Sequence, residues 1–129
     1  MSIIALVLAA LAGVLHLAIF VMESFLWRTP RVRATFAVRS DAEAEATVAM
    51  AYNQGWYNAF LGIGALLGVV LVLADTTTPG WTLVVFSCGC MLAAALVLVT
   101  TDVKYRAAAV KQGTLPALAL LAALVGQLT

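Results

Sequence analysis

The chain has 129 residues, of which 64% are apolar and only 10% are charged. A soluble domain carries about 25% charged residues and about 45–50% apolar ones, and a chain this short has too little interior to bury the excess. The composition therefore excludes a soluble enzyme domain and predicts a single domain that uses a lipid bilayer as its solvent.

Four segments are long and apolar enough to cross a bilayer. They cover about residues 2–27, 56–73, 81–100 and 114–128, and a spanning helix needs roughly 20 such residues. We therefore predict an all-α membrane protein, a four-helix transmembrane bundle. Because no basic residue precedes the first segment, it does not fit a secretory signal, and we expect it to be a retained span.

The connection between the first two spans contains a predicted helix start. The first helix should stop just before Pro30, because proline pushes the preceding residue out of helical geometry. The basic stretch 31–39 can lie on anionic headgroups. Ser40 and Glu43 have the spacing of a capping box, which predicts a short cytoplasmic amphipathic helix. This helix is expected to meet the second span near Gly55, where a kink is plausible.

The second half of the chain again alternates spans and connections. Residues 76–80, Thr-Thr-Thr-Pro-Gly, predict a tight turn between the second and third spans. Residues 102–113 are amphipathic; we expect Gly113 to end that segment and Pro116 to stand where a new helix starts. The fourth span is short, so it is expected to include residues that precede Pro116.

The seven basic residues orient the chain. Four of them lie between the first two spans and three between the last two, whereas the remaining turn and both termini have none. Because lysine and arginine concentrate in cytoplasmic loops, we predict that both basic loops are cytoplasmic and that both termini lie outside the cytoplasm.

One face of the first span carries the only histidine of the chain and the only acidic residue inside a span. Residues spaced by three or four form this stripe, namely Ala9, Gly13, His16, Phe20, Glu23 and Trp27. A charged carboxylate in a bilayer costs at least about 2.5–3.5 kcal/mol, so Glu23 should face the bundle interior and have a partner. His16 should lie deeper, about 10 Å from Glu23 along the axis. We interpret Glu23 and His16 as candidate catalytic acid and base groups.

The start of the second span supplies polar groups at the depth of Glu23. Gln54 and Asn58 share one helix face, and Asn53 and Tyr57 share the adjacent face. Aromatic side chains from both spans accompany them. The predicted substrate-binding residues are Asn53, Gln54, Asn58, Tyr57, Trp27, Trp56 and Phe20.

Each of these groups also has a structural interpretation. An amide inside a membrane more often joins helices than takes part in a reaction. Glu23 can pair with Arg28 or Lys104 as a structural salt bridge, and His16 can be a buried, hydrogen-bonded imidazole. The sequence alone leaves these alternatives open.

Three runs of residues resemble a known family. They are His16…Glu23-Ser24-Phe25-Leu26-Trp27-Arg28-Thr29-Pro30-Arg31, Asn53-Gln54-Gly55-Trp56-Tyr57-Asn58-Ala59-Phe60-Leu61, and Gln112…Leu115-Pro116-Ala117. They resemble a family of small bacterial membrane proteins catalogued as domain of unknown function 1304, of which a typical member has Met in place of Ser24 and Gly in place of Ala59. The resemblance covers nearly the whole chain. It implies four spans in a bacterial inner (plasma) membrane but no activity.

Three functions fit these observations. The first is a membrane-embedded isomerase or cyclase with a polar pocket open to the cytoplasm, which takes an isoprenoid- or sterol-like molecule from the lipid and protonates it, by chemical analogy to membrane sterol isomerases. The second is a proton-linked carrier or efflux subunit, for which four spans predict a homodimer packed through the glycine-bearing second span. The third is a structural partner of a larger membrane complex.

The expected partners are the lipid bilayer and an apolar small molecule. The sequence contains no glycine-rich phosphate loop, no cluster of metal ligands and no basic stripe long enough for nucleic acid. We therefore expect no cofactor, no metal and no nucleic-acid partner.

Overall fold

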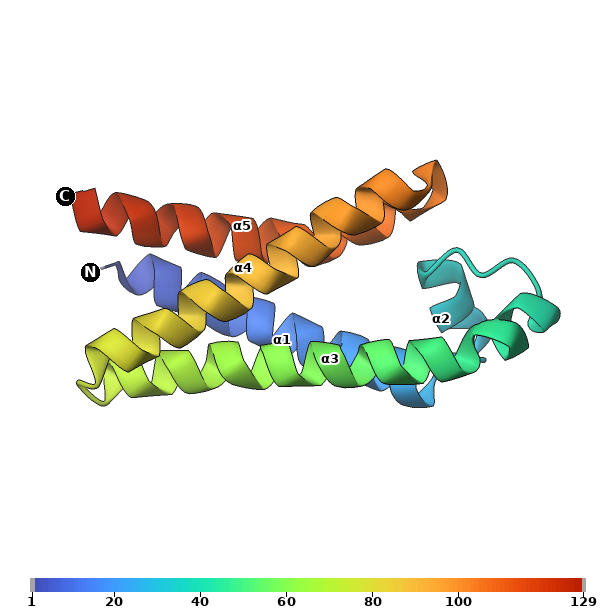
Figure 1. Cartoon of the computed structure of the whole chain (residues 1–129), viewed down its shortest axis with the longest axis horizontal. Helices are drawn as coiled ribbons and strands as arrows, with labels where there is room; N and C mark the ends of the chain where they lie inside the picture. Colours follow the sequence, from blue (N-terminus) through green and yellow to red (C-terminus); the bar gives the residue numbers. More distant parts are fainter. Residues whose placement is uncertain (1, 129) are drawn as a thin grey trace.

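The protein is a bundle of long helices, as a computed structural model that describes residues 2–128 shows (Figure 1). Four helices are long and apolar enough to cross a membrane, which confirms the predicted all-α architecture. In chain order the elements are α1 (Ile3–Phe25), α2 (Pro30–Thr35), α3 (Asp41–Leu73), α4 (Thr77–Thr101), the 3₁₀ turn η1 (Val103–Tyr105) and α5 (Arg106–Leu128).

The helix that begins after Ser40 is continuous with the second span. The Ser40 hydroxyl accepts a hydrogen bond from the Glu43 backbone N–H at 3.0 Å, so the predicted cap forms. With 33 residues, α3 is about 50 Å long, which exceeds a hydrocarbon core of about 30 Å. Its first turns therefore extend beyond the membrane. The separate short helix of this connection is α2, which begins at Pro30 and covers the first part of the stretch 31–39 that was predicted to lie on headgroups.

The predicted helix break between Gly113 and Pro116 is wrong. Both residues lie inside α5, which runs without interruption from Arg106 to Leu128. A proline inside a spanning helix is tolerated where neighbouring helices enclose it, and Pro116 is among the fully buried side chains. Gly113 is needed for helix packing, since a Cβ there would lie 2.8 Å from the Ala95 Cβ of α4.

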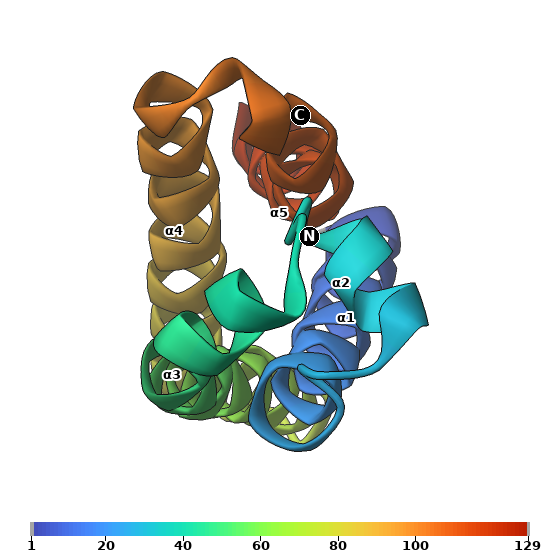
Figure 2. The same cartoon turned by 90° about the vertical axis from the view of Figure 1, so that its right-hand side faces the viewer.

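The four long helices form a ring in which each packs against two of the others. α1 contacts α3 and α5, and α4 contacts α3 and α5, as the end view shows (Figure 2). The helices alternate in direction, as in an up-down-up-down bundle. Figure 1 shows that α4 diverges from α3, starting at the turn that joins them. The end of the bundle that contains α2 and η1 is called the polar end below, and the end with both termini is called the terminal end.

Glycines allow the helix backbones to approach closely. A Cβ at Gly62 of α3 would lie 2.8 Å from the Gly13 carbonyl oxygen of α1, and a Cβ at Gly68 would lie 2.8 Å from the Gly80 carbonyl oxygen of α4. Gly64 in turn faces the Ser87 hydroxyl of α4. The glycines of α3 are therefore used in packing within one chain, and a homodimer would need a different face.

Large apolar side chains cover the outside of the bundle. Val7, Phe60, Phe86 and Leu121 are each more than half exposed, whereas the interior contains many alanines and glycines. A soluble protein rarely exposes so much contiguous apolar surface, and small residues at helix contacts are typical of membrane bundles. The packing therefore agrees with a multi-pass membrane protein.

Gly62→Ala is expected to destabilise the bundle by about 1–3 kcal/mol, because the added methyl group would overlap a backbone oxygen that cannot move aside. Thermal unfolding in detergent micelles, followed by circular dichroism, measures the change. Gly89→Ala is the matched control, since a Cβ at Gly89 would meet no atom within 4 Å. Equal melting temperatures for the two variants would contradict the close approach of α1 and α3.

Candidate functional site

A buried carboxyl–amide pair joins α1 to α3. The Asn58 amide nitrogen donates a hydrogen bond to Oε2 of Glu23 at 2.8 Å and a second to the Gln54 carbonyl oxygen at 3.2 Å. The Glu23 side chain lies in the last turn of α1 and is only 8% exposed. Within residues 2–128, Asn58 is the only side chain that hydrogen-bonds to this carboxyl group.

The close approach of the two helices places this pair. A Cβ at Gly55 would lie 3.0 Å from the Phe20 carbonyl oxygen and even closer to the Ser24 hydroxyl, so Gly55 is required where α3 passes α1. The Ser24 hydroxyl also donates a hydrogen bond to the Tyr52 carbonyl oxygen at 3.2 Å. Asn58 follows Gly55 by three residues, nearly one helical turn, and this brings its amide level with Glu23.

Neither predicted salt-bridge partner pairs with Glu23. Arg28 makes two hydrogen bonds to the carboxylate of Glu45, at 2.8 and 2.9 Å, and these bonds together with the charge of Glu45 raise the pKa of the Arg28 guanidinium. Lys104 reaches Glu43 at 3.5 Å. These two cations are thus paired with acidic residues at the start of α3, and Glu23 has a neutral partner.

His16 is buried deeper in α1 and is only 2% exposed. Its Nδ1 lies 2.9 Å from the Ala12 carbonyl oxygen, and because a carbonyl oxygen can only accept, Nδ1 must carry the proton. In a neutral ring, Nε2 is then the acceptor. Ile19 is buried on the same stripe between His16 and Glu23, and seven residues separate the two groups by about 10 Å. The structure therefore places them on one interior face without direct contact.

Aromatic residues of α1 and α3 form a cluster at the contact between these two helices. The rings of Phe20 and Trp56 are 4.7 Å apart, and Trp56 also contacts Tyr52 and Phe60. Trp56 precedes Asn58 by two residues and so lies about 200° round α3 from it. The cluster is therefore on the outer side of the α1–α3 contact. The sequence interpretation missed Tyr52 and Phe60, although their spacing of four residues from Trp56 indicates a shared face.

The other predicted site residues lie apart from Glu23. The Trp27 indole N–H donates a hydrogen bond to the Thr47 hydroxyl at 3.1 Å, so Trp27 joins the end of α1 to the first turns of α3. Tyr57 is 61% exposed, and Asn53 and Gln54 are exposed at the surface of α3. Of the predicted set, the structure brings together Glu23 with Asn58 and Phe20 with Trp56.

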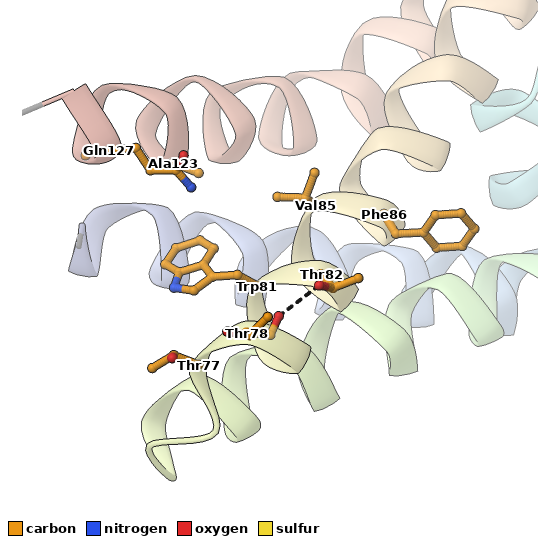
Figure 3. A pocket seen from close by; sticks show the side chains of 9 residues that line it. Thr77, Thr78, Trp81, Thr82, Val85, Phe86, Ala123 and Gln127 are labelled. Carbon is orange, nitrogen blue, oxygen red and sulfur yellow. Dashed lines mark hydrogen bonds between the residues drawn. The ribbon is translucent and has the colours of Figure 1, made fainter.

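Two open hollows lie at the terminal end, away from this pair. One of about 720 Å³ lies between α4 and α5, lined by residues such as Trp81 and Phe86 (Figure 3). The other, of about 670 Å³, lies between α1 and α5 and includes Leu8 and Leu118. Neither is lined by a residue of the predicted site.

The carboxyl–amide hydrogen bond should appear as a coupling free energy. In a double-mutant cycle of Glu23→Ala and Asn58→Ala, we expect a coupling on the order of 1 kcal/mol, because each single change removes the same interhelical bond. Unfolding of the four proteins in mixed micelles measures it. A cycle of Glu23→Ala with Gln54→Ala is the control and should be additive. Additivity in both cycles would contradict the pairing.

A comparison with protein families identifies the chain. A family model described as "Protein of unknown function (DUF1304)" matches residues 10–124. That range includes both members of the carboxyl–amide pair, His16, all of α3 and α4, and most of α1 and α5. No curated protein and no solved structure matches the chain. The chain therefore belongs to the family of proteins of unknown function called DUF1304.

Proposed function

We propose that this protein is a membrane-embedded isomerase or cyclase, in which Glu23 exchanges a proton with an isoprenoid- or sterol-like molecule taken from the lipid. One observation carries the proposal: a buried carboxyl group in a spanning helix has a neutral amide as its hydrogen-bond partner and, among residues 2–128, no ion-pair partner. Ionisable groups at such positions are costly and usually functional. The two cations at the same end that were expected to neutralise Glu23, Arg28 and Lys104, pair with other carboxylates.

The proposed chemistry needs no cofactor. Glu23 gives its proton to one carbon of a double bond, which leaves a cation on the neighbouring carbon, and the carboxylate later takes a proton from an adjacent carbon. Asn58 holds the carboxyl group in place. Phe20 lies about 60° round α1 from Glu23, and in the proposal the face of its ring stabilises the cation. In the proposal, His16 lies deeper in the bundle than Glu23 and can accept a proton at Nε2.

The exposed residues at the start of the second span form the approach to this site. Gln54 and Tyr57 are exposed on α3, and α4 diverges from α3 toward this end of the bundle (Figure 1). Asn53 and Trp27 lie at the same end. In the proposal these polar and amphipathic side chains orient the head of the molecule while its apolar part enters from the lipid.

A proton-linked carrier is the weaker alternative. A carrier needs polar groups along the whole bundle axis, but the buried stripe of α1 beyond His16 consists of Ala12, Ala9 and Ala5, each 0% exposed. This apolar continuation supports a site that is closed toward the terminal end. A structural subunit of a larger complex is the other alternative, and it predicts that a neutral substitute for Glu23 changes nothing.

The proposed orientation places the polar end in the cytoplasm of a bacterium. Cys88→Ala and Cys90→Ala first remove the two cysteines of the chain. In this background, Thr76→Cys should react with a membrane-impermeant maleimide on right-side-out spheroplasts. Ala42→Cys should react only after lysis, because it lies at the opposite end of α3. Labelling in the reverse order would overturn the orientation.

The catalytic proposal is tested with Glu23→Gln, which keeps the size and the hydrogen bond to Asn58 but cannot transfer a proton. Protein purified gently from its own membrane is analysed by native mass spectrometry, and any retained molecule is separated by chromatography. We expect wild type to contain two isomers of equal mass and Glu23→Gln to contain one. Conversion of the isolated isomer should fall by roughly 10²–10⁴-fold.

Glu45→Gln is the matched control for this experiment. Glu45 is exposed and pairs with Arg28, so its neutral variant should retain the same two isomers as wild type. If all three proteins hold no apolar molecule, or hold identical isomer mixtures, the catalytic proposal is wrong and the structural alternative stands.

A further inference from the structure

The hollow between α4 and α5 at the terminal end lies far from Glu23 along the bundle. α4 and α5 meet closely near the polar end, where Gly113 faces Ala95. From there the two helices diverge, and the hollow occupies the wedge between the start of α4 and the end of α5 (Figures 1 and 3). Its volume of about 720 Å³ lies within the range of roughly 300–1,000 Å³ that holds small ligands.

Small residues keep the wedge open. Ala123 and Gly126 form its α5 wall, and Gly126 packs so closely on Ser2 that a Cβ there would lie 2.8 Å from the Ser2 Cβ. On the other side, the Trp81 ring packs against the buried core of the bundle. Trp81, Phe86 and Gln127 line the hollow without closing it, so the apolar part of a molecule from the lipid has room between the two helices.

The lining changes from apolar to polar along the bundle axis. Val85 and Phe86, which are 45% and 66% exposed, form the part nearer the middle of α4. Thr77, Thr78 and Gln127 lie at the terminal end (Figure 3). No charged side chain lines the wedge. Hydroxyl and amide groups without charge match a head group that forms hydrogen bonds but carries no net charge.

We propose that this wedge binds one long apolar chain with a neutral, hydrogen-bonding head such as an alcohol or an ester. The chain lies along Val85 and Phe86, and the head lies among Thr77, Thr78 and Gln127. The binding is independent of the proposed chemistry at Glu23. A phosphate or ammonium head finds no counter-charge in the wedge and is disfavoured.

The second hollow provides an internal control. It lies between α1 and α5, has a similar volume of about 670 Å³, and has Ser2 as its one hydroxyl-bearing lining residue. Ordinary bilayer lipid would contact both hollows equally, whereas a selective site would favour the wedge between α4 and α5.

The test uses a photoactivatable probe, a diazirine-bearing hexadecanol, added to the full-length protein in phosphatidylcholine nanodiscs. The same chain with a phosphate head is the comparison. Labelled peptides are mapped by mass spectrometry. Hexadecanol is expected to label residues 77–86, Ala123 and Gln127 of the wedge in preference to Ile4, Leu8 and Leu121 of the second hollow. It is also expected to label the wedge more strongly than the phosphate probe does.

Val85→Trp should reduce this labelling by roughly tenfold or more, because the indole displaces several methylene groups of the bound chain. Leu118→Trp is the matched control, since Leu118 lines the second hollow and has nearly the same exposure, 44% against 45%. If Val85→Trp does not give a folded protein, Thr77→Val with Thr78→Val replaces it and should remove the preference for the hydroxyl head.

Three outcomes would overturn the proposal. The first is equal labelling of all lipid-facing segments, which would mean that the wedge contains ordinary bilayer lipid and is not a selective site. The second is stronger labelling by the phosphate probe. The third is a change from dimer to monomer in Val85→Trp, which would mean that a second copy of the chain fills the wedge.

Discussion

The close packing of α1 against α3 is the contact on which the rest of the arrangement depends. Gly13 and Gly62 face each other so closely that a Cβ at either would lie within 3.0 Å of the carbonyl oxygen of the other. Lipid provides no hydrophobic force that drives helices together, so association relies on such packing and on interhelical hydrogen bonds. Gly55 continues the contact toward the polar end, and the bond between Asn58 and Glu23 follows from it.

The two ends of the bundle differ in the charge of their side chains. At the polar end, Arg28 and Lys104 are paired with acidic residues at the start of α3. The buried carboxyl group of Glu23 instead has a neutral amide as its partner. At the terminal end, no charged side chain lines either hollow, so apolar molecules are the natural occupants. A buried carboxyl group therefore lies at one end of the bundle, and uncharged hollows lie at the other.

The number and order of the spans could be predicted from the sequence, because the length and hydropathy of a spanning helix depend only on bilayer thickness. The Ser40 cap was predictable for the same local reason, since its hydrogen bond joins residues three apart. The break at Pro116 was not predictable. Local preference favours a helix start at proline, but the surrounding helices bury Pro116 and allow α5 to continue.

For the candidate site, the sequence by itself determined which side chains are polar within the spans and that His16 and Glu23 share one face of α1, because helical periodicity is a local property. Only the tertiary structure decided that Asn58, rather than Asn53 or Gln54, bonds to Glu23. It also decided that the Phe20–Trp56 cluster lies on the outer side of the contact. The rotation and axial shift of one helix against another depend on close packing at glycines, and periodicity within a single helix carries no information about either.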